Sequence, residues 1–157
     1  CGHLYDANLA CGRAPICGAD CLEKISGPLL DRFDLRIEML QVPADELKRE
    51  PTGDSSAEVA DRVEAARAIQ TKRYADMDRA HTNSDCEGEM LMEVCRPTQA
   101  GQAMLDLATE RFSLSARGYH RVLRVARTIA DLAGDADIDT PHIGEASSYR
   151  LVAAPKV

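Results

Sequence analysis

The sequence predicts a mainly α-helical chain in which a helical domain follows a loop and a single β-strand. The 157 residues contain no tryptophan and only 4% aromatic residues. The core must therefore be built from aliphatic residues and alanine, which suits packed helices better than a β-sandwich. From Ser55 to about Arg150 the apolar residues recur with the period of amphipathic helices, and capping residues mark the helix ends.

Length and charge limit the function classes. A chain of this length forms one ordinary domain, or one domain and part of another. The formal net charge of −7 argues against an autonomous nucleic-acid binder, because neutralising phosphates requires clustered lysine and arginine. No run approaches the roughly 18 apolar residues that span a bilayer, and no signal peptide is recognisable. The expected location is the reducing cytoplasm.

The first 43 residues combine a cysteine-rich loop with a strand. Cysteine and glycine recur without periodicity from Cys1 to Cys21, which predicts a loop. Apolar and charged residues alternate from Phe33 to Met39, as in a half-buried strand. A single strand leaves its backbone groups unpaired, so its partners are expected in a larger protein of which this chain is the C-terminal part. Residues 44–54, which include a proline and a glycine, are predicted to be a linker.

Five helices are predicted in residues 55–150, ahead of a frayed tail over residues 151–157. Ser55 and Glu58 have the spacing of a capping box, which starts a helix that ends near Tyr74. Ser84 and Glu87 repeat that spacing before a short helix. The other three helices are marked by Met104–Phe112, by Ser115 as N-cap with Gly134 as stop, and by Thr140-Pro141 with an end near Arg150.

Three arginines form a stripe on the helix that starts after Ser115. Arg117, Arg121 and Arg124 fall within about 60° of one another, opposite the apolar side of that helix. Such a stripe is either a solvated face or an anion site. Arg117 favours the anion site, because it lies in the first turn, where the helix dipole stabilises negative charge.

Arg32 is the second candidate, at the point where a loop enters the predicted strand. Two interpretations stay open. In the first, a rigid strand displays the arginine at the edge of a core, where it serves a function. In the second, Arg32 makes a surface ion pair with Asp31 or Asp34, which contributes little to stability.

The cysteines allow a metal site near the start of the chain. Four of them suit tetrahedral coordination by sulfur, although the sequence lacks a C-x-x-C pair: Cys1, Cys11, Cys17 and Cys21. Cys86 and Cys95 lie in or beside a predicted helix and are expected to be inert thiols. His120 and His142 are expected to be structural or exposed, and not metal ligands.

Two long motifs resemble a known family. Residues 25–35, ISGPLLDRFDL, are similar to the segment before the last core strand in AAA+ ATPases of the magnesium-chelatase-like group. Residues 115–132, SARGYHRVLRVARTIADL, resemble the C-terminal helical lid of that group. Ser55–Val59 and Tyr149-Arg150 also fit its competence-related bacterial branch. The resemblance runs from Cys1 to about Arg150 and implies the last loop and strand of an α/β AAA+ core, followed by the helical lid.

The resemblance also implies roles for single residues. Arg32 resembles the arginine finger that reaches into a neighbouring subunit's ATP site. Arg117 resembles the sensor-2 arginine that touches the γ-phosphate, and Arg117 and Arg121 are the residues expected to contact nucleotide. In this group a long inserted helix, here residues 55–75, can reposition the lid so that Arg117 also acts across a subunit boundary. The phosphate loop is not found in this sequence, so the chain alone is not expected to hydrolyse ATP.

The implied parent protein uses ATP and magnesium, assembles as a homo-oligomeric ring, a hexamer, and remodels DNA during uptake or recombination. Relatives imply zinc held by Cys1, Cys11 and Cys17 with one upstream ligand, for which Cys21 or His3 could substitute. Two other functions stay open: the motor subunit of a magnesium chelatase, and a zinc-bearing helical interaction module without enzymatic activity.

Overall fold

The computed structural model describes residues 9–14, 16–37, 39, 42–43, 45–50 and 52–150. Contacts divide the chain into two units, and the larger one spans Gly53–Arg150. The described residues before Gly53 belong to the other unit. Helices dominate the described residues, which contain no β-strand, so the mainly α fold class is confirmed. None of the helices in these ranges is long and apolar enough to cross a membrane.

The first unit corrects two sequence-based expectations. The loop predicted over Cys1–Cys21 is wrong from Ile16 onward, where α1 (Ile16–Glu23) begins. The strand predicted over Phe33–Met39 is not formed by residues 33–37 and 39. Its apolar side chains are 49–83% exposed where a half-buried strand would cover them. A strand needs backbone partners, and none of the described residues supplies them. The unit also contains α2 (Gly27–Leu30) and, in the predicted linker, the 3-10 turn η1 (Glu46–Lys48).

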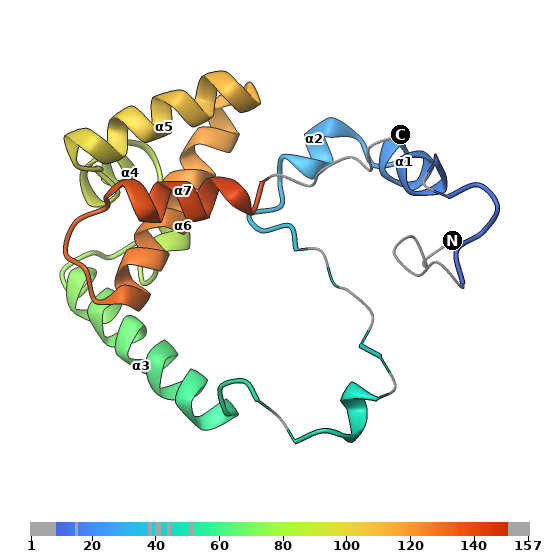
Figure 1. The fold of residues 1–157 in the computed structure, drawn as a ribbon. Helices are drawn as coiled ribbons and strands as arrows, with labels where there is room; N and C mark the ends of the chain where they lie inside the picture. The colour runs from blue at the N-terminus through green and yellow to red at the C-terminus, as the bar shows by residue number, and fades with distance from the viewer. Residues whose placement is uncertain are drawn as a thin grey trace. The chain divides into compact units, whose positions relative to one another are not determined.

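The larger unit begins with the long helix α3 (Ser56–Arg73). The predicted capping box is confirmed: the Glu58 backbone N–H donates to Ser55 Oγ at 3.3 Å, and the Ser55 backbone N–H donates to Glu58 Oε2 at 2.7 Å. Within α3, which the structure describes in full, only Ala66 and Gln70 are buried. The helix therefore packs through its C-terminal half, while its N-terminal half extends away from the other helices of the unit (Figure 1).

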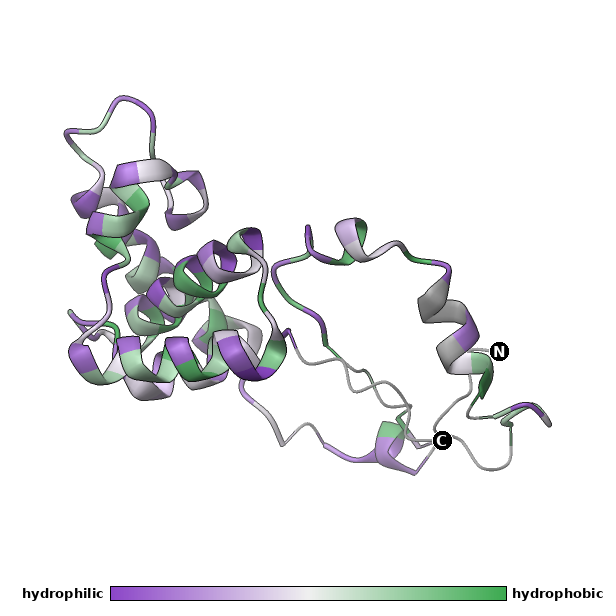
Figure 2. Cartoon of the chain, turned by 90° about the horizontal axis from the view of Figure 1, so that it is seen from above, coloured by the Kyte–Doolittle hydropathy of each residue, from purple (hydrophilic) through white to green (hydrophobic). Residues whose placement is uncertain are grey.

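Helix α6 (Ala116–Ala133) lies at the centre of the larger unit. It packs against α7 (Thr140–Ser148), α3 and α4 (Gly88–Val94), and against the 3-10 turn η2 (Asn83–Asp85), while α5 (Gln99–Phe112) packs on α7. Each helix carries both polar and apolar bands, as amphipathic helices do (Figure 2). The largest fully buried apolar side chains of the core are Leu91, Leu105, Leu123, Ile138, Ile143 and Val122.

The ends of α6 match the prediction. Ser115 is the N-cap, and its Oγ accepts from the Gly118 backbone N–H at 3.1 Å. Gly134 ends the helix in the left-handed conformation with φ +78°. Only glycine adopts that conformation without a steric penalty from Cβ.

Two other caps differ from the prediction. The capping box before α4 is formed by Thr82 and Asp85 around η2, because the Asp85 carboxylate accepts from the backbone N–H of Thr82 at 2.8 Å. The predicted Ser84–Glu87 pair does not cap α4, whose N-cap Glu87 makes no side-chain cap bond. The N-cap of α7 is Asp139, one residue before the predicted Thr140, and a carboxylate accepts the first N–H there at 2.8 Å.

Candidate functional site

Arg117 lies in the first turn of α6 and is exposed. The first backbone N–H groups of a helix lack intrahelical acceptors and carry a partial positive charge. Ser115 satisfies one of them by accepting from Gly118. The remaining positive potential and the Arg117 guanidinium point to the same ligand class, an anion such as a phosphate group.

The other two arginines of the predicted stripe have different environments. Arg121 is half-buried. Arg124 is also half-buried, and its Nε donates to the backbone oxygen of Cys86 at 2.9 Å, which ties α6 to the segment after η2. The prediction of a solvated or anion-binding face is therefore wrong for Arg124, since its guanidinium makes a tertiary hydrogen bond within the lid. Arg117 is the member of the stripe that is exposed.

Arg32 lies in the turn that follows α2 and is exposed. Its backbone N–H donates to the oxygen of Leu29 at 3.0 Å, and the N–H of Phe33 donates to the oxygen of Leu30 at 3.2 Å. These bonds hold the backbone of Arg32 in a helical turn, where the sequence interpretation had expected the edge of a strand. Arg32 and Arg117 belong to different units.

The sequence did not predict a buried polar cluster between α3, η2 and α6. Its centre is the carboxylate of Asp131, whose side chain is 0% exposed. Arg73 from the end of α3 donates from Nη1 to Oδ2 at 2.8 Å and from Nη2 to Oδ1 at 2.5 Å. Arg127 donates from Nε to Oδ1 at 3.1 Å, and Asn83 donates from Nδ2 to Oδ2 at 2.8 Å. Each carboxylate oxygen thus accepts two hydrogen bonds, which satisfies a buried charge fully.

The electrostatics of the cluster favour an ionised Asp131. Burial alone would raise the pKa of this carboxyl group. Hydrogen bonds from Arg73 and Asn83 and the charges of Arg127 and Arg73 outweigh burial, so the pKa lies below its ordinary value. Arg127 in turn donates to the backbone oxygens of Ala136 and Asp135 at 2.8 and 2.7 Å. The cluster therefore joins α3, η2, α6 and the loop after α6.

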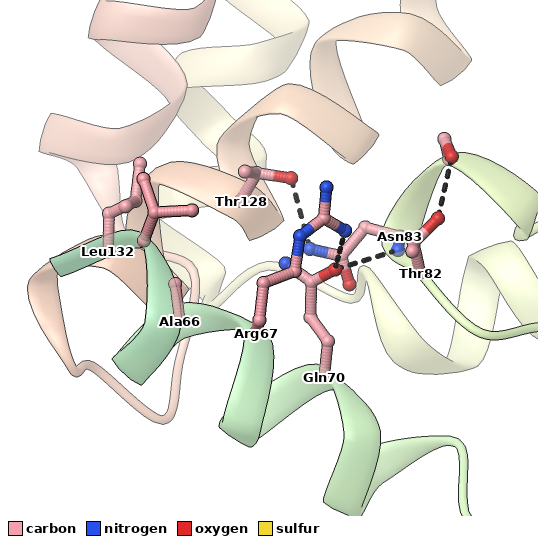
Figure 3. A pocket seen from close by; sticks show the side chains of 9 residues that line it. Ala66, Arg67, Gln70, Thr82, Asn83, Thr128 and Leu132 are labelled. Carbon is pink, nitrogen blue, oxygen red and sulfur yellow. Dashed lines mark hydrogen bonds between the residues drawn. The ribbon is translucent and has the colours of Figure 1, made fainter. Parts of the chain in front are cut away.

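A groove of about 300 Å³ lies next to this cluster, between α3, η2 and α6. Gln70, Asn83 and Thr128 converge at one side of it, and Ala66 and Leu132 line its apolar part (Figure 3). Asn83 Nδ2 donates to Thr128 Oγ1 at 3.0 Å, so the polar wall of the groove continues the buried cluster.

Two cysteines of the proposed metal site are close to each other in the first unit. The pKa of the Cys11 thiol is lowered, first by a hydrogen bond from the backbone of Arg13 and next by one from Cys17. A lowered pKa favours the thiolate, the form that binds metals. Cys1 and His3 lie outside the described residues, and Cys21 lies in α1. Among the residues that the structure describes, no three potential ligands come together.

The remaining thiols and histidines lie in the larger unit. Cys86 and Cys95 are fully buried, and burial raises the pKa of Cys95 to about 12, which makes it an inert thiol. His142 Nδ1 accepts from the backbone N–H of Asp139 at 3.0 Å, so His142 helps to cap α7, as a structural histidine does.

Two family descriptions match this chain. The family description "Magnesium chelatase, subunit ChlI C-terminal" matches residues 53–150, and "Magnesium chelatase, subunit ChlI" matches residues 1–47. The chain belongs to the magnesium-chelatase-like family. The larger unit is therefore a helical lid of this AAA+ family, and the family membership and fold class predicted from the sequence are confirmed.

Several curated relatives are similar to most of this chain. Competence protein ComM of Haemophilus influenzae is 38% identical over 132 residues, which are 83% of this chain and 25% of that protein. Uncharacterized protein YifB of Escherichia coli is 37% identical over 132 residues, with the same coverage of 83% and 25%. Uncharacterized protein Rv2897c of Mycobacterium tuberculosis is 38% identical over 136 residues, 85% of this chain and 26% of that protein. The chain thus spans about a quarter of the length of these relatives.

Proposed function

We propose that this chain is the C-terminal part of an oligomeric AAA+ ATPase and that it supplies two arginines for ATP hydrolysis. Arg117 acts as the sensor-2 arginine on the γ-phosphate, with Arg121 one turn further along α6 as a second nucleotide contact. Arg32 acts as the arginine finger in the ATP site of a neighbouring subunit. Members of this family use nucleotide and magnesium and generally form rings. The ring proposed for this protein is a cytoplasmic hexamer.

The observation that carries the proposal is the position of Arg117. An exposed guanidinium in the first turn of a capped, 18-residue helix combines a full charge with the positive end of a helix dipole. A bound nucleotide supplies the phosphoryl group and its magnesium ion supplies charge neutralisation; the lid arginine orients and stabilises the terminal phosphate. Arg117 lies outside the buried core, so its exposed side chain can contact a bound nucleotide.

Replacing Arg117 with alanine in the full-length protein is expected to lower ATP turnover on the order of 10²-fold, because a positioned charge is lost from the transition state. The lid should stay folded, since a surface substitution of this kind changes stability by roughly 0.5 kcal/mol or less. Steady-state ATPase assays and thermal unfolding measure the two effects. Arg111→Ala is the matched control: Arg111 is an exposed arginine of the lid at the C-terminal end of α5, and turnover should not change. Normal turnover in Arg117→Ala would indicate that Arg117 is part of a solvated face and has no role in hydrolysis.

We further propose that the parent couples hydrolysis to remodelling DNA during uptake or recombination. Support comes from the 38% identity to a protein named for competence. The alternative is the motor subunit of a magnesium chelatase, which the name of the matching family favours. Branched DNA should stimulate the ATPase of a DNA-remodelling ring, whereas a chelatase motor should respond to porphyrin-metallating partner proteins.

Zinc is proposed as a structural metal of the first unit, held by Cys1, Cys11, Cys17 and a further ligand. We expect about one zinc per chain in the full-length protein, measured by mass spectrometry after dialysis against a weak chelator. Cys11→Ser and Cys17→Ser should each lose most of the metal, because a thiolate ligand is removed. Cys95→Ala is the control, since this buried thiol lies in the other unit. Unchanged zinc in both serine variants would contradict the proposed site.

A further inference from the structure

Polar contacts at the C-terminal end of α3 help attach it to the lid, next to its C-cap residue Tyr74, which is buried in the core. Of its 18 residues only two are buried, and Val59 and Val63 in its N-terminal half are 42% and 46% exposed. So little apolar burial fixes the angle between two helices poorly, because burial is non-directional. Arg73, the last residue of α3, supplies a directional bond to α6.

The bond between Arg73 and Asp131 is a two-point contact. Two parallel N–H groups of the guanidinium donate to the two carboxylate oxygens, at 2.8 and 2.5 Å. Such a forked pair fixes direction as well as distance. Nη1 of Arg73 also donates to Asn83 Oδ1 at 3.0 Å, and Gln70 Oε1 accepts from the Asn83 backbone N–H at 3.4 Å. The end of α3 is therefore held against both α6 and η2.

Asp131 and Arg117 lie at opposite ends of the same helix. They are separated by 14 residues, which correspond to about 21 Å of helix axis. Over that length, a tilt of about 5° at the Asp131 end displaces the Arg117 end by roughly 2 Å. Displacements on the order of 1 Å at a reacting group can lower turnover by about 10²-fold. A change in the angle between α3 and α6 would therefore displace Arg117, at the far end of α6, far enough to affect turnover.

We propose that Arg73 is a positioning residue for hydrolysis: its forked bond to Asp131 makes α3 and α6 one rigid element and thereby directs Arg117 at its ligand. This inference rests on the proposed role of Arg117.

Arg73→Met in the full-length protein tests the proposal with little damage to the buried cluster. Asp131 keeps its bonds from Arg127 and Asn83, so the carboxylate stays paired. Turnover is expected to fall roughly 3- to 30-fold, the range of coupling through a packed network, with ATP affinity unchanged. Amide exchange in residues 67–72 should accelerate at least about 10-fold while exchange in residues 122–130 is unchanged. Arg62→Met is the matched control, because Arg62 is an exposed arginine of α3 that pairs with Asp54 before the helix, away from Asp131, and both readouts should stay normal.

A double variant separates positioning from general destabilisation. If Arg73 acts through Arg117, adding Arg73→Met to Arg117→Ala should lower turnover no further, whereas independent effects at this separation multiply. A multiplied loss would overturn the positioning role while leaving the role of Arg117 intact. Normal turnover in Arg117→Ala would instead overturn the proposed function, and the inference with it.

Arg73→Lys covers the case in which Arg73→Met unfolds the lid. Lysine keeps the charge beside Asp131 but makes a point contact without the fork. Turnover should fall at least about 3-fold in a lid with unchanged melting temperature. Normal turnover in that folded variant would overturn the proposal.

Discussion

Replacing Arg32 with alanine is expected to lower ATP turnover of the full-length protein by roughly 10³- to 10⁵-fold, the range measured for arginine fingers, with ATP affinity changed only a few-fold. The reason is chemical. Guanidinium stays charged and presents forked donors to phosphate oxygens, which lysine does not match, so Arg32→Lys should also be strongly impaired. Steady-state kinetics and calorimetric ATP binding on the same preparations measure the two quantities.

The competing interpretation is a local ion pair of Arg32 with Asp31 or Asp34. It predicts a change in stability of about 1 kcal/mol or less and normal turnover in Arg32→Ala. Arg13→Ala is a matched control in the same unit. Arg13 is exposed and pairs with Asp20, so its loss should leave turnover unchanged.

Mixed rings test whether Arg32 acts across the subunit boundary. A phosphate-loop variant keeps a functional Arg32, and an Arg32→Ala subunit keeps a functional phosphate loop. In a ring that contains both, some interfaces combine the two functional parts, so part of the ATPase activity should return. Two inactive variants that recover no activity at any mixing ratio would contradict action in trans.

The helical lid could be predicted because its signals are local. Ser55 with Glu58, Ser115 and Gly134 each act within one helical turn, so the sequence alone places these helix ends correctly. Asp139 was missed because Thr140 is also a favoured N-cap residue and places Pro141 at the first helical position, whereas in the structure Pro141 is the second residue of α7.

The segment Phe33–Met39 shows the limit of local pattern. Alternation of apolar and charged residues describes how a strand would face a core, but strand formation depends on hydrogen bonds to other strands. In the structure, residues 33–37 and 39 keep the pattern without forming the strand.

The polar cluster was missed for a different reason. Arg73 and Asp131 are 58 residues apart, and no local pattern joins them. Part of the signal was present, since Arg127 and Asp131 are oppositely charged and one turn apart, on the side of α6 that also carries the buried Leu123 and Ala130. Opposite charges on the same helix face as core residues indicate a buried ion pair. The sequence-based prediction rested on the arginine stripe on the other face of this helix.

Removing the carboxylate from this cluster has the largest expected effect on stability. In Asp131→Ala, Arg127 remains with a side chain only 4% exposed and without its anionic partner. Breaking a buried ion pair from one side costs about 3–5 kcal/mol, because a buried charge is left uncompensated. Urea unfolding of the 157-residue chain, followed by helical circular dichroism, measures the loss. Asp106→Ala is the control: Asp106 is exposed and accepts from Gln102 one turn earlier in the same helix, so about 0.5 kcal/mol or less should be lost.

The pH dependence of this loss identifies its electrostatic origin. The pKa of Asp131 is lowered in the folded chain, so its contribution to stability is fully present above the ordinary aspartate pKa of about 3.9. The contribution is lost as the pH falls below that value and through the lowered pKa, because the folded state must then protonate a carboxyl group that it holds ionised. Other carboxylates of the lid with lowered pKa values, such as Asp139, titrate in both proteins and cancel in the difference. The difference in unfolding free energy between the unsubstituted 157-residue chain and Asp131→Ala should therefore be constant from pH 7 to about pH 5 and shrink below pH 4. A difference that stays constant to pH 2 would indicate that lost packing, and not the ion pairs with Arg73 and Arg127, explains the destabilisation.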